Sequence, residues 1–345
     1  MTIPSFSQLT SVTACLCLPW LVQAQKTYTV NDLGSLGGDF VSAFAVNQHG
    51  QIAGRASTPS SPTHAFLFSA GLLTDLGSLP GWTRSRAQGI NNRTQIVGFS
   101  AGSPTDIHAF LWSNGQLTDI HPIVSFGGTA SFAFAINDAG HIAGDATTSH
   151  NVEDHAFLLR NGTVLDLGTL GGTFSASDAV SAADMVVGVS SLPGDAIYHA
   201  FLWDGTLLDL GSLGGSYSEA FALNNDGTIA GFSLLPGDTV EHAFRYRHGI
   251  LQDLHTPALP ANSAAIGINN SGQIVGVGLP TTDDVFTGNI ALLWDGDEVI
   301  DLNSRIPAGS GWQLYRAAAI NDRGDIVGVG NHNGQIRAFL LTSAQ

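Results

Sequence analysis

Lysine is almost absent from this chain, and positive charge in general is scarce. One lysine, Lys26, and eleven arginines stand against 28 acidic residues, which gives a formal net charge of −16. Because nucleic acids attract proteins through clustered positive charge, this balance argues against a nucleic-acid partner. Charged residues make up only 12% of the sequence, so long solvent-exposed helices with charged faces are not expected.

Cysteine is missing from the chain after its first 24 residues. Cys15 and Cys17 lie in an uncharged N-terminal segment whose apolar run ends at Val22-Gln23-Ala24. Small residues at this spacing suit signal peptidase, so residues 1–24 are predicted to be a cleaved secretory signal, although no Lys or Arg precedes the apolar run. A short membrane anchor is the alternative. We expect a protein secreted to the extracellular space or periplasm that folds without disulfides.

Long apolar runs and metal-binding patterns are also missing. No stretch after residue 24 is long and apolar enough to span a bilayer, so no membrane span is expected after signal cleavage. No His or Cys cluster has zinc spacing, and neither a metal nor another cofactor is predicted. The Asn-Asp-x-Gly turns and the LPGD segments at 192–195 and 235–238 lack the spacing of a dedicated calcium loop, which leaves room only for weak surface calcium.

Glycine, in contrast, is abundant, and much of it belongs to a repeat. The pattern Asn-x4-Ile/Val-x-Gly occurs six times, and a seventh copy has Ser181 in place of the Asn. The closing glycines are Gly54, Gly98, Gly144, Gly188, Gly231, Gly276 and Gly328. They are separated by 44, 46, 44, 43, 45 and 52 residues, which indicates an array of seven units.

Each unit is predicted to contain four short β-strands. The first strand ends at the Asn, and the positions two and four before it are small in all seven copies, as at Ala43 and Ala45. An Asn-x-x-Gly hairpin turn leads to a second strand. The third strand carries His-Ala-Phe, and the fourth ends in Asp-Leu or Asp-Ile. A residue present in nearly every unit is expected to be structural, so we interpret the repeated His and Asp as forming hydrogen bonds between blades or at turns.

The repeated motif resembles the extracellular repeat family named HAF. The likeness spans about residues 27–342 and rests on the His-Ala-Phe copies that begin at His64, His108, His155, His199 and His242. It implies a secreted, propeller-like protein and implies no activity. Ile290 and Arg337 replace the His in the last two units, and Ser181 and Asp184 replace the Asn and Gly of the fourth turn, so these units are expected to be less regular.

The strand order predicts how the array closes. The chain begins with one strand of the fourth type, at 27–33, and ends with the first three strands of a seventh unit, so the strands total 28. We therefore predict an all-β, seven-bladed β-propeller of four-stranded blades, closed by the N-terminal strand completing the last blade. An open array would instead need polar capping units. The single domain covers 25–345, with units at about 40–79, 84–121, 130–168, 175–211, 217–254, 263–302, and 316–342 plus 27–33.

A binding site is expected on the face formed by the variable loops. The loops between second and third strands and the linkers between units differ most, and binding residues tend to lie on such loops. The most divergent segments are 79–86, 121–128, 279–289 and 303–316. The ligand-binding candidates in them are Trp82, Arg84, Arg86, Asp283, Asp284, Phe286, Arg305, Trp312, Tyr315 and Arg316. Aromatic rings beside arginines and carboxylates suit a sugar or peptide.

Three functions remain open at this point. We favour a secreted, monomeric binding or scaffold module for an extracellular carbohydrate or protein. The alternative is an extracellular propeller enzyme, a polysaccharide lyase or glycan hydrolase. It would need a base and a charge-neutralising group near the ring mouth, and the candidates are His121, His255, Tyr315 and Arg316. A surface adhesin or structural element is the third. We do not favour the enzyme.

Overall fold

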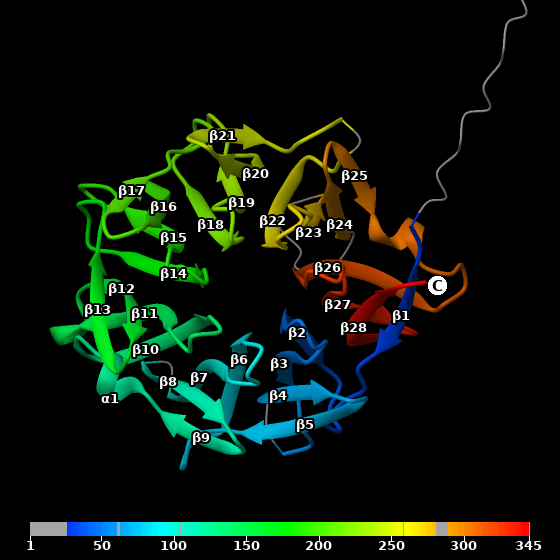
Figure 1. Ribbon diagram of the computed structural model, residues 1–345, viewed down its shortest axis with the longest axis horizontal. Helices are drawn as coiled ribbons and strands as arrows, with labels where there is room; N and C mark the ends of the chain where they lie inside the picture. The colour runs from blue at the N-terminus through cyan, green and yellow to red at the C-terminus, as the bar shows by residue number, and fades with distance from the viewer. Residues whose placement is uncertain (1–25, 61–62, 104, 258, 281–288, 345) are drawn as a thin grey trace, which may run out of the picture.

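The protein is a β-propeller of four-stranded blades. The computed structural model describes residues 26–60, 63–103, 105–257, 259–280 and 289–344, and in them it holds 28 strands, the predicted number. The strands are arranged in sheets around a central axis (Figure 1). One helical turn, α1 (His121–Val124), and two 3-10 turns, η1 (Ser149–Asn151) and η2 (Leu302–Arg305), complete the described secondary structure. No described helix has the length and apolar character needed to cross a membrane.

Four of the sheets each contain four consecutive strands in antiparallel order. The first contains β2 (Val41–Val46), β3 (Ile52–Ala56), β4 (His64–Ser69) and β5 (Leu72–Gly77). The second contains β14 (Ser175–Val180), β15 (Val186–Ser191), β16 (Tyr198–Trp203) and β17 (Leu207–Asp209). The third contains β18 (Ser218–Leu223), β19 (Ile229–Leu234), β20 (Glu241–Arg247) and β21 (Ile250–Asp253). The fourth contains β22 (Asn262–Ile268), β23 (Ile274–Leu279), β24 (Ile290–Asp295) and β25 (Glu298–Asp301).

Two repeat units share one eight-stranded sheet. One contributes β6 (Arg84–Ile90), β7 (Ile96–Ser103), β8 (Asp106–Ser113) and β9 (Gln116–Asp119). The next contributes β10 (Gly127–Ile136), β11 (Ile142–Thr148), β12 (Asp154–Arg160) and β13 (Thr163–Gly168). The two antiparallel groups are joined by parallel pairing of β8 with β10 at Ile107 and Ala130.

The last sheet joins the two ends of the described chain, as the strand order predicted. It contains β26 (Trp312–Ile320), β27 (Ile326–His332), β28 (Gln335–Ser343) and β1 (Tyr28–Asp32). β1 pairs antiparallel with β28 from Tyr28 opposite Ser343 to Asp32 opposite Phe339. Tyr28 is 2% exposed and Leu33 is 3% exposed, so the N-terminal strand is part of the core rather than an attachment to its edge.

The His-Ala-Phe and closing-glycine motifs meet in the core of each unit. The Phe of the third strand is fully buried in six units, at Phe66, Phe110, Phe157, Phe201, Phe244 and Phe339. In the register, Phe66 lies opposite Gly54, and a Cβ on Gly54 would come within 2.7 Å of its ring. The glycine is required because the phenylalanine ring and the backbone of the first strand both occupy the space of a side chain.

Parts of the segments that were predicted to be variable loops are regular structure. α1 forms where no helix was expected; Pro122 lies at its start, where a missing amide hydrogen costs nothing. β6 begins at Arg84 and β26 at Trp312, so Arg84, Arg86, Trp312, Tyr315 and Arg316 lie on strands. In β26 the pairing is interrupted by a register shift between Leu314 and Arg316, so Tyr315 lies at a bulge.

Candidate functional site

A shift in strand register recurs in the first strand of all seven units. In β2 the shift falls between Ala43 and Ala45, the two small positions before the Asn, and the other six first strands shift at the equivalent place. Such a bulge re-aims the residue between the paired positions. The residues at this position are Phe44, Gln88, Phe134, Asp178, Phe221, Ile266 and Ala318.

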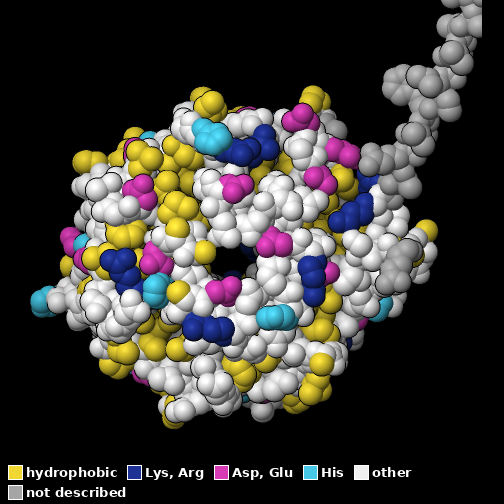
Figure 2. Space-filling view, viewed as in Figure 1, with side chains coloured by type: hydrophobic (Ala, Val, Ile, Leu, Met, Phe, Trp, Pro, Cys, Tyr) yellow, Lys and Arg dark blue, Asp and Glu magenta, His cyan; other side chains and the backbone are white. Residues whose placement is uncertain are grey.

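These seven residues line a central channel. Together with Arg86 and Arg316 they surround a cavity of about 280 Å³. A wider cavity of about 490 Å³ lies next to it, lined by the starts of first strands and the ends of second strands, the side from which the variable loops leave the sheets. Phe44, Arg86, Phe221 and Arg316 line both spaces. Viewed along the axis, the surface is hollowed at its centre (Figure 2).

One wall of the channel carries three arginines: Arg55, Arg86 and Arg316. The Arg86 guanidinium lies 4.1 Å from the ring centre of Phe44, and that of Arg55 lies 5.1 Å from Phe40. Burial lowers the pKa of all three. For Arg86, burial and then the positive charges of Arg55 and Arg316 lower the pKa to about 10. In the part of the chain that the structure describes, none of the three donates a side-chain hydrogen bond or forms an ion pair, and each Nε is buried without a partner.

Asp178 lines the narrower cavity of the channel, and the carboxyl groups of Glu219 and Asp145 lie close enough to influence it. Burial raises the pKa of Asp178 well above its ordinary value, and the neighbouring Glu219 and Asp145 raise it further. Burial also raises the pKa of Glu219, although Tyr217 donates a hydrogen bond of 2.9 Å to its Oε2. Asp145 is 6% exposed, and its pKa is raised by burial and then by Asp154. Burial thus raises the pKa of all three carboxyl groups and opposes their ionisation in the folded protein.

A row of aromatic rings approaches the channel from the sheet of β14–β17. Neighbouring ring centres are 5.6–5.9 Å apart along Phe174, Tyr198, Tyr217, Phe232 and Phe221. All five rings are half-buried, and the last two line the wider cavity. The channel mouth thus combines apolar ring surface with fixed positive charge, the mixture typical of sites for polar organic ligands.

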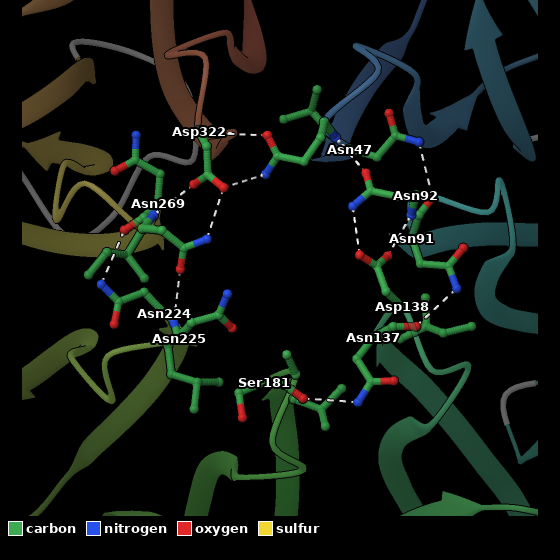
Figure 3. A pocket seen from close by; sticks show the side chains of 18 of the residues that line it. Asn47, Asn91, Asn92, Asn137, Asp138, Ser181, Asn224, Asn225, Asn269 and Asp322 are labelled. Atoms are coloured by element: carbon green, nitrogen blue, oxygen red, sulfur yellow. Dashed lines mark hydrogen bonds between the residues drawn. The ribbon is translucent and has the colours of Figure 1, made fainter.

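The opposite opening of the channel is ringed by the Asn-x-x-Gly turns. The side-chain amide of each turn Asn donates to the backbone carbonyl of the next turn, as from Asn47 to Asn91 at 3.0 Å. The residue after the Asn forms a second ring, as where Asn92 contacts Asp138. The first ring breaks after Ser181 (Figure 3), and the second breaks at Ala182, whose side chain cannot accept a hydrogen bond. These hydrogen bonds hold neighbouring units together, so this opening is structural.

The repeated His and Asp also make structural contacts. In five units the His Nδ1 lies 2.8–3.1 Å from the Asp of the same unit, as in His64 and Asp75. The Asp also accepts a backbone amide two residues later, as from Gly77 to Asp75. The expected turn-fixing bond is confirmed, whereas the bond between blades is made by a serine: Ser85 Oγ accepts the amide of Ala65.

Of the ten ligand-binding candidates, the structure brings two together in the channel, Arg86 and Arg316. Arg84 is exposed and lines a side cavity of about 200 Å³ with Arg55 and Arg86. The Trp82 ring lies 4.7 Å from His108, and the Trp312 ring stacks on His332 at 4.6 Å.

The remaining ligand candidates lie elsewhere. Arg305 is 8% exposed and pairs with Glu298 at 3.0 Å, and Tyr315 is buried. Asp283, Asp284 and Phe286 lie outside the described residues.

The four candidates for catalysis are not gathered at one place among the described residues. His121 stacks on His108 at 4.0 Å and its Nδ1 lies 2.9 Å from Ser131 Oγ, whereas His255 stacks on His242 at 4.1 Å. Burial and the neighbouring histidine lower the pKa of both. Of the set, Arg316 alone lines the channel.

The potential metal ligands of the LPGD segments are used within the protein. Asp195 accepts the amide of Thr173 at 2.8 Å, and Asp238 accepts that of Ser216 at 2.7 Å. Within residues 26–344, leaving out the undescribed positions, there is no group of three or more side chains suited to holding a metal ion.

Comparison with known proteins supports the fold and gives no family. No family model and no curated protein matches this chain, so the HAF resemblance stays a prediction. The β-propeller domain of the Trilobed protease from Pyrococcus furiosus, described as having an open velcro topology, is 9% identical with a TM-score of 0.56, covering 92% of this chain and 95% of that one.

Two enzymes share the same architecture. A puromycin-hydrolyzing peptidase of Mycobacterium tuberculosis is 12% identical with a TM-score of 0.56, over 84% of this chain and only 48% of that one. An oligogalacturonate lyase of Vibrio parahaemolyticus is 9% identical with a TM-score of 0.53, over 91% and 93% of the two chains. This chain therefore spans about half the length of the peptidase, and at these identities the likenesses show the fold alone.

Proposed function

We propose that this protein is a binding module whose ligand, an extracellular carbohydrate or protein, enters the channel from the variable-loop side. The observation that carries the proposal is the bulge position. Its neighbours Ala43 and Ala45 have small counterparts in every unit, while the bulge residue itself is aromatic, amide, acidic or aliphatic. In a repeat protein, variation at equivalent positions that line one cavity favours recognition, since packing alone would keep them alike.

Catalysis finds less support. The lyase or hydrolase alternative needs a base beside a charge-neutralising group, and His121, His255 and Tyr315 line neither channel cavity among the described residues. We therefore do not propose a reaction.

The first experiment is a glycan array probed with the purified protein, followed by product analysis of every glycan that it retains. Retention without cleavage, lost in Phe44→Leu and Phe221→Leu, is the expected result. Ile250→Ala, which changes a side chain that is 68% exposed outside the cavity, is the matched control. Cleavage of a retained glycan would make the protein an enzyme. No retention would redirect the search to protein ligands, which would be sought by crosslinking through the same channel residues.

We also propose that the 28 strands form seven blades, with the eight-stranded sheet counted as two. One parallel register pair, Ala130 with Ile107, joins its two antiparallel groups. An experimental structure with seven radial sheets would support this count, and a continuous curved sheet would contradict it. Secretion as a HAF-type repeat protein remains part of the proposal. Mass spectrometry of the secreted chain should give an N-terminus at Gln25, and a retained leader would favour an anchor.

A further inference from the structure

The three arginines of the channel are unusual in this protein because they are placed together and unpaired. The chain has 28 acidic residues, yet among the described part of the chain no carboxylate pairs with Arg55, Arg86 or Arg316. Three arginines elsewhere form ion pairs: Arg160 with Asp184, Arg305 with Glu298 and Arg323 with Asp325. Gathering three like charges beside a cavity costs folding free energy, and a bound anion would offset that cost.

The geometry also leaves the guanidinium groups available to a ligand. Arg86 lies over the face of Phe44 at 4.1 Å, which orients the planar group while leaving its N–H edge unoccupied. Arg86 and Arg316 both line the two channel cavities, and Arg55 lines the wider one. Planar N–H donors held in this way suit the two oxygens of a carboxylate.

The rest of the cavity indicates what carries the carboxylate. Phe44, Phe221 and Phe232 present half-buried ring surface beside the arginines, and two carboxyl groups line the same channel, Asp178 in the narrower cavity and Glu241 in the wider one. Ring surface packs against the C–H face of a sugar, and carboxyl groups bond to hydroxyls. A volume of about 490 Å³ lies within the usual range for small-molecule sites.

We propose that the channel binds an acidic saccharide, a hexuronate, whose carboxylate lies against Arg55, Arg86 and Arg316 while its ring packs on Phe44 and Phe221. This inference rests on the proposed binding function and adds the ligand class. It treats the arginine wall as the recognition element and the aromatic residues as the surface that accepts the sugar ring.

The test is calorimetric titration of the purified protein with glucuronate and galacturonate. The comparison probes are their methyl esters, glucose, inorganic sulfate and phosphate, and a short glutamate-rich peptide. We expect at least one uronate to bind and its methyl ester to bind at least tenfold more weakly. Arg86→Gln and Arg316→Gln should each weaken uronate binding by about tenfold to a hundredfold, because each removes a charged hydrogen-bond donor.

Arg93→Gln is the matched control, since Arg93 lies in the turn Asn91-Asn92-Arg93-Thr94, at the other end of the channel. Its affinity for the uronate should equal that of the unaltered protein. The channel variants should melt at or above the unaltered temperature because each removes one of three repelling charges, which separates lost binding from lost folding.

The outcomes that overturn the inference differ from those that overturn the proposed function. Equal binding of uronate and ester, unchanged uronate binding in both channel variants, or preference for sulfate or phosphate would each overturn a carboxylate site. Binding of the acidic peptide alone would overturn the saccharide. If neutral glycans are retained on the array through Phe44 and Phe221 without dependence on the arginines, the binding function stands and this inference fails. If the protein binds neither uronates nor the glycans of the array, both this inference and the proposed binding function are overturned.

Discussion

The Asn at the start of a turn links neighbouring units through its side-chain amide. Six of the seven turns have it, and in each the amide oxygen accepts two backbone amides of its own turn while the nitrogen donates to the next turn, as in Asn91. The Oγ of Ser181 also accepts two backbone amides of its own turn, but this side chain is too short to donate to the carbonyl of Asn224. The ring is therefore weakest between the units of β14–β17 and β18–β21.

We predict that Ser181→Asn stabilises the protein by about 1 kcal/mol, because the new amide can donate to the carbonyl of Asn224. Urea denaturation measures the change in the free energy of unfolding. Asn137→Ser, which removes an existing bond to Ser181, should cost a similar amount and is the reciprocal control. An unchanged midpoint for Ser181→Asn would mean that closing the ring adds nothing.

The buried acids of the channel predict a pH dependence of stability. The pKa values of Asp178 and Glu219 lie above their ordinary 3.8 and 4.5 in the folded protein. As pH rises past the ordinary values, the unfolded chain releases protons that the folded chain holds, so the free energy of unfolding falls until the buried groups ionise.

Asp178→Asn and Glu219→Gln should therefore flatten this decline. Each should stabilise the protein at pH 8 relative to pH 4, with each unit of pKa shift worth about 1.4 kcal/mol. Denaturation midpoints between pH 4 and 9 measure the effect, and Asp204→Asn, at an exposed turn, is the control. Parallel curves for all four proteins would show that the acid pair does not hold its protons.

At the scale of single elements, the closing strand carries a large share of the stability. Deleting 26–33 removes β1 and exposes the edge of β28, and loss of the buried Tyr28 and Leu33 alone should cost about 3–6 kcal/mol. A synthetic 26–39 peptide added in trans should restore the melting temperature. Thr29→Ala, on the exposed side of β1, should change little. An unchanged melt after deletion would argue for an open array.

The sequence predicted the elements better than it predicted the site. Periodic glycines and the His-Ala-Phe motif recur because packing repeats, so the strands, the turn and the closure of the ring follow from the pattern. The channel residues Phe44 and Asp178 share no chemistry and therefore leave no motif. The signal that could have found them is a variable position between two positions that are small in every unit, as at 43–45. Ser85 and its counterparts, which link neighbouring units, were missed because serine is common in any chain.

At the scale of the whole molecule, the exposed apolar side chains of the described residues bear on whether the protein associates. Its ends are paired through β1 and β28, and the exposed large apolar side chains of the described residues are scattered over several units: Leu72, Ile123, Val152, Ile197, Leu208 and Ile250. Single exposed apolar residues are normal for monomers. We predict the mass of one chain by light scattering across micromolar concentrations, and a concentration-dependent rise in mass would contradict this.

Because β1 and β28 pair within one sheet, the contacts between units do not depend on where the chain begins. The amide of Ala344 donates to the carbonyl of Thr27 at 2.9 Å, so the two ends of the described chain lie side by side. A circularly permuted chain, with these ends linked and a new opening in the turn before another fourth strand, would present the same set of contacts. The chain could thus begin and end at the same place in any other unit without altering the channel.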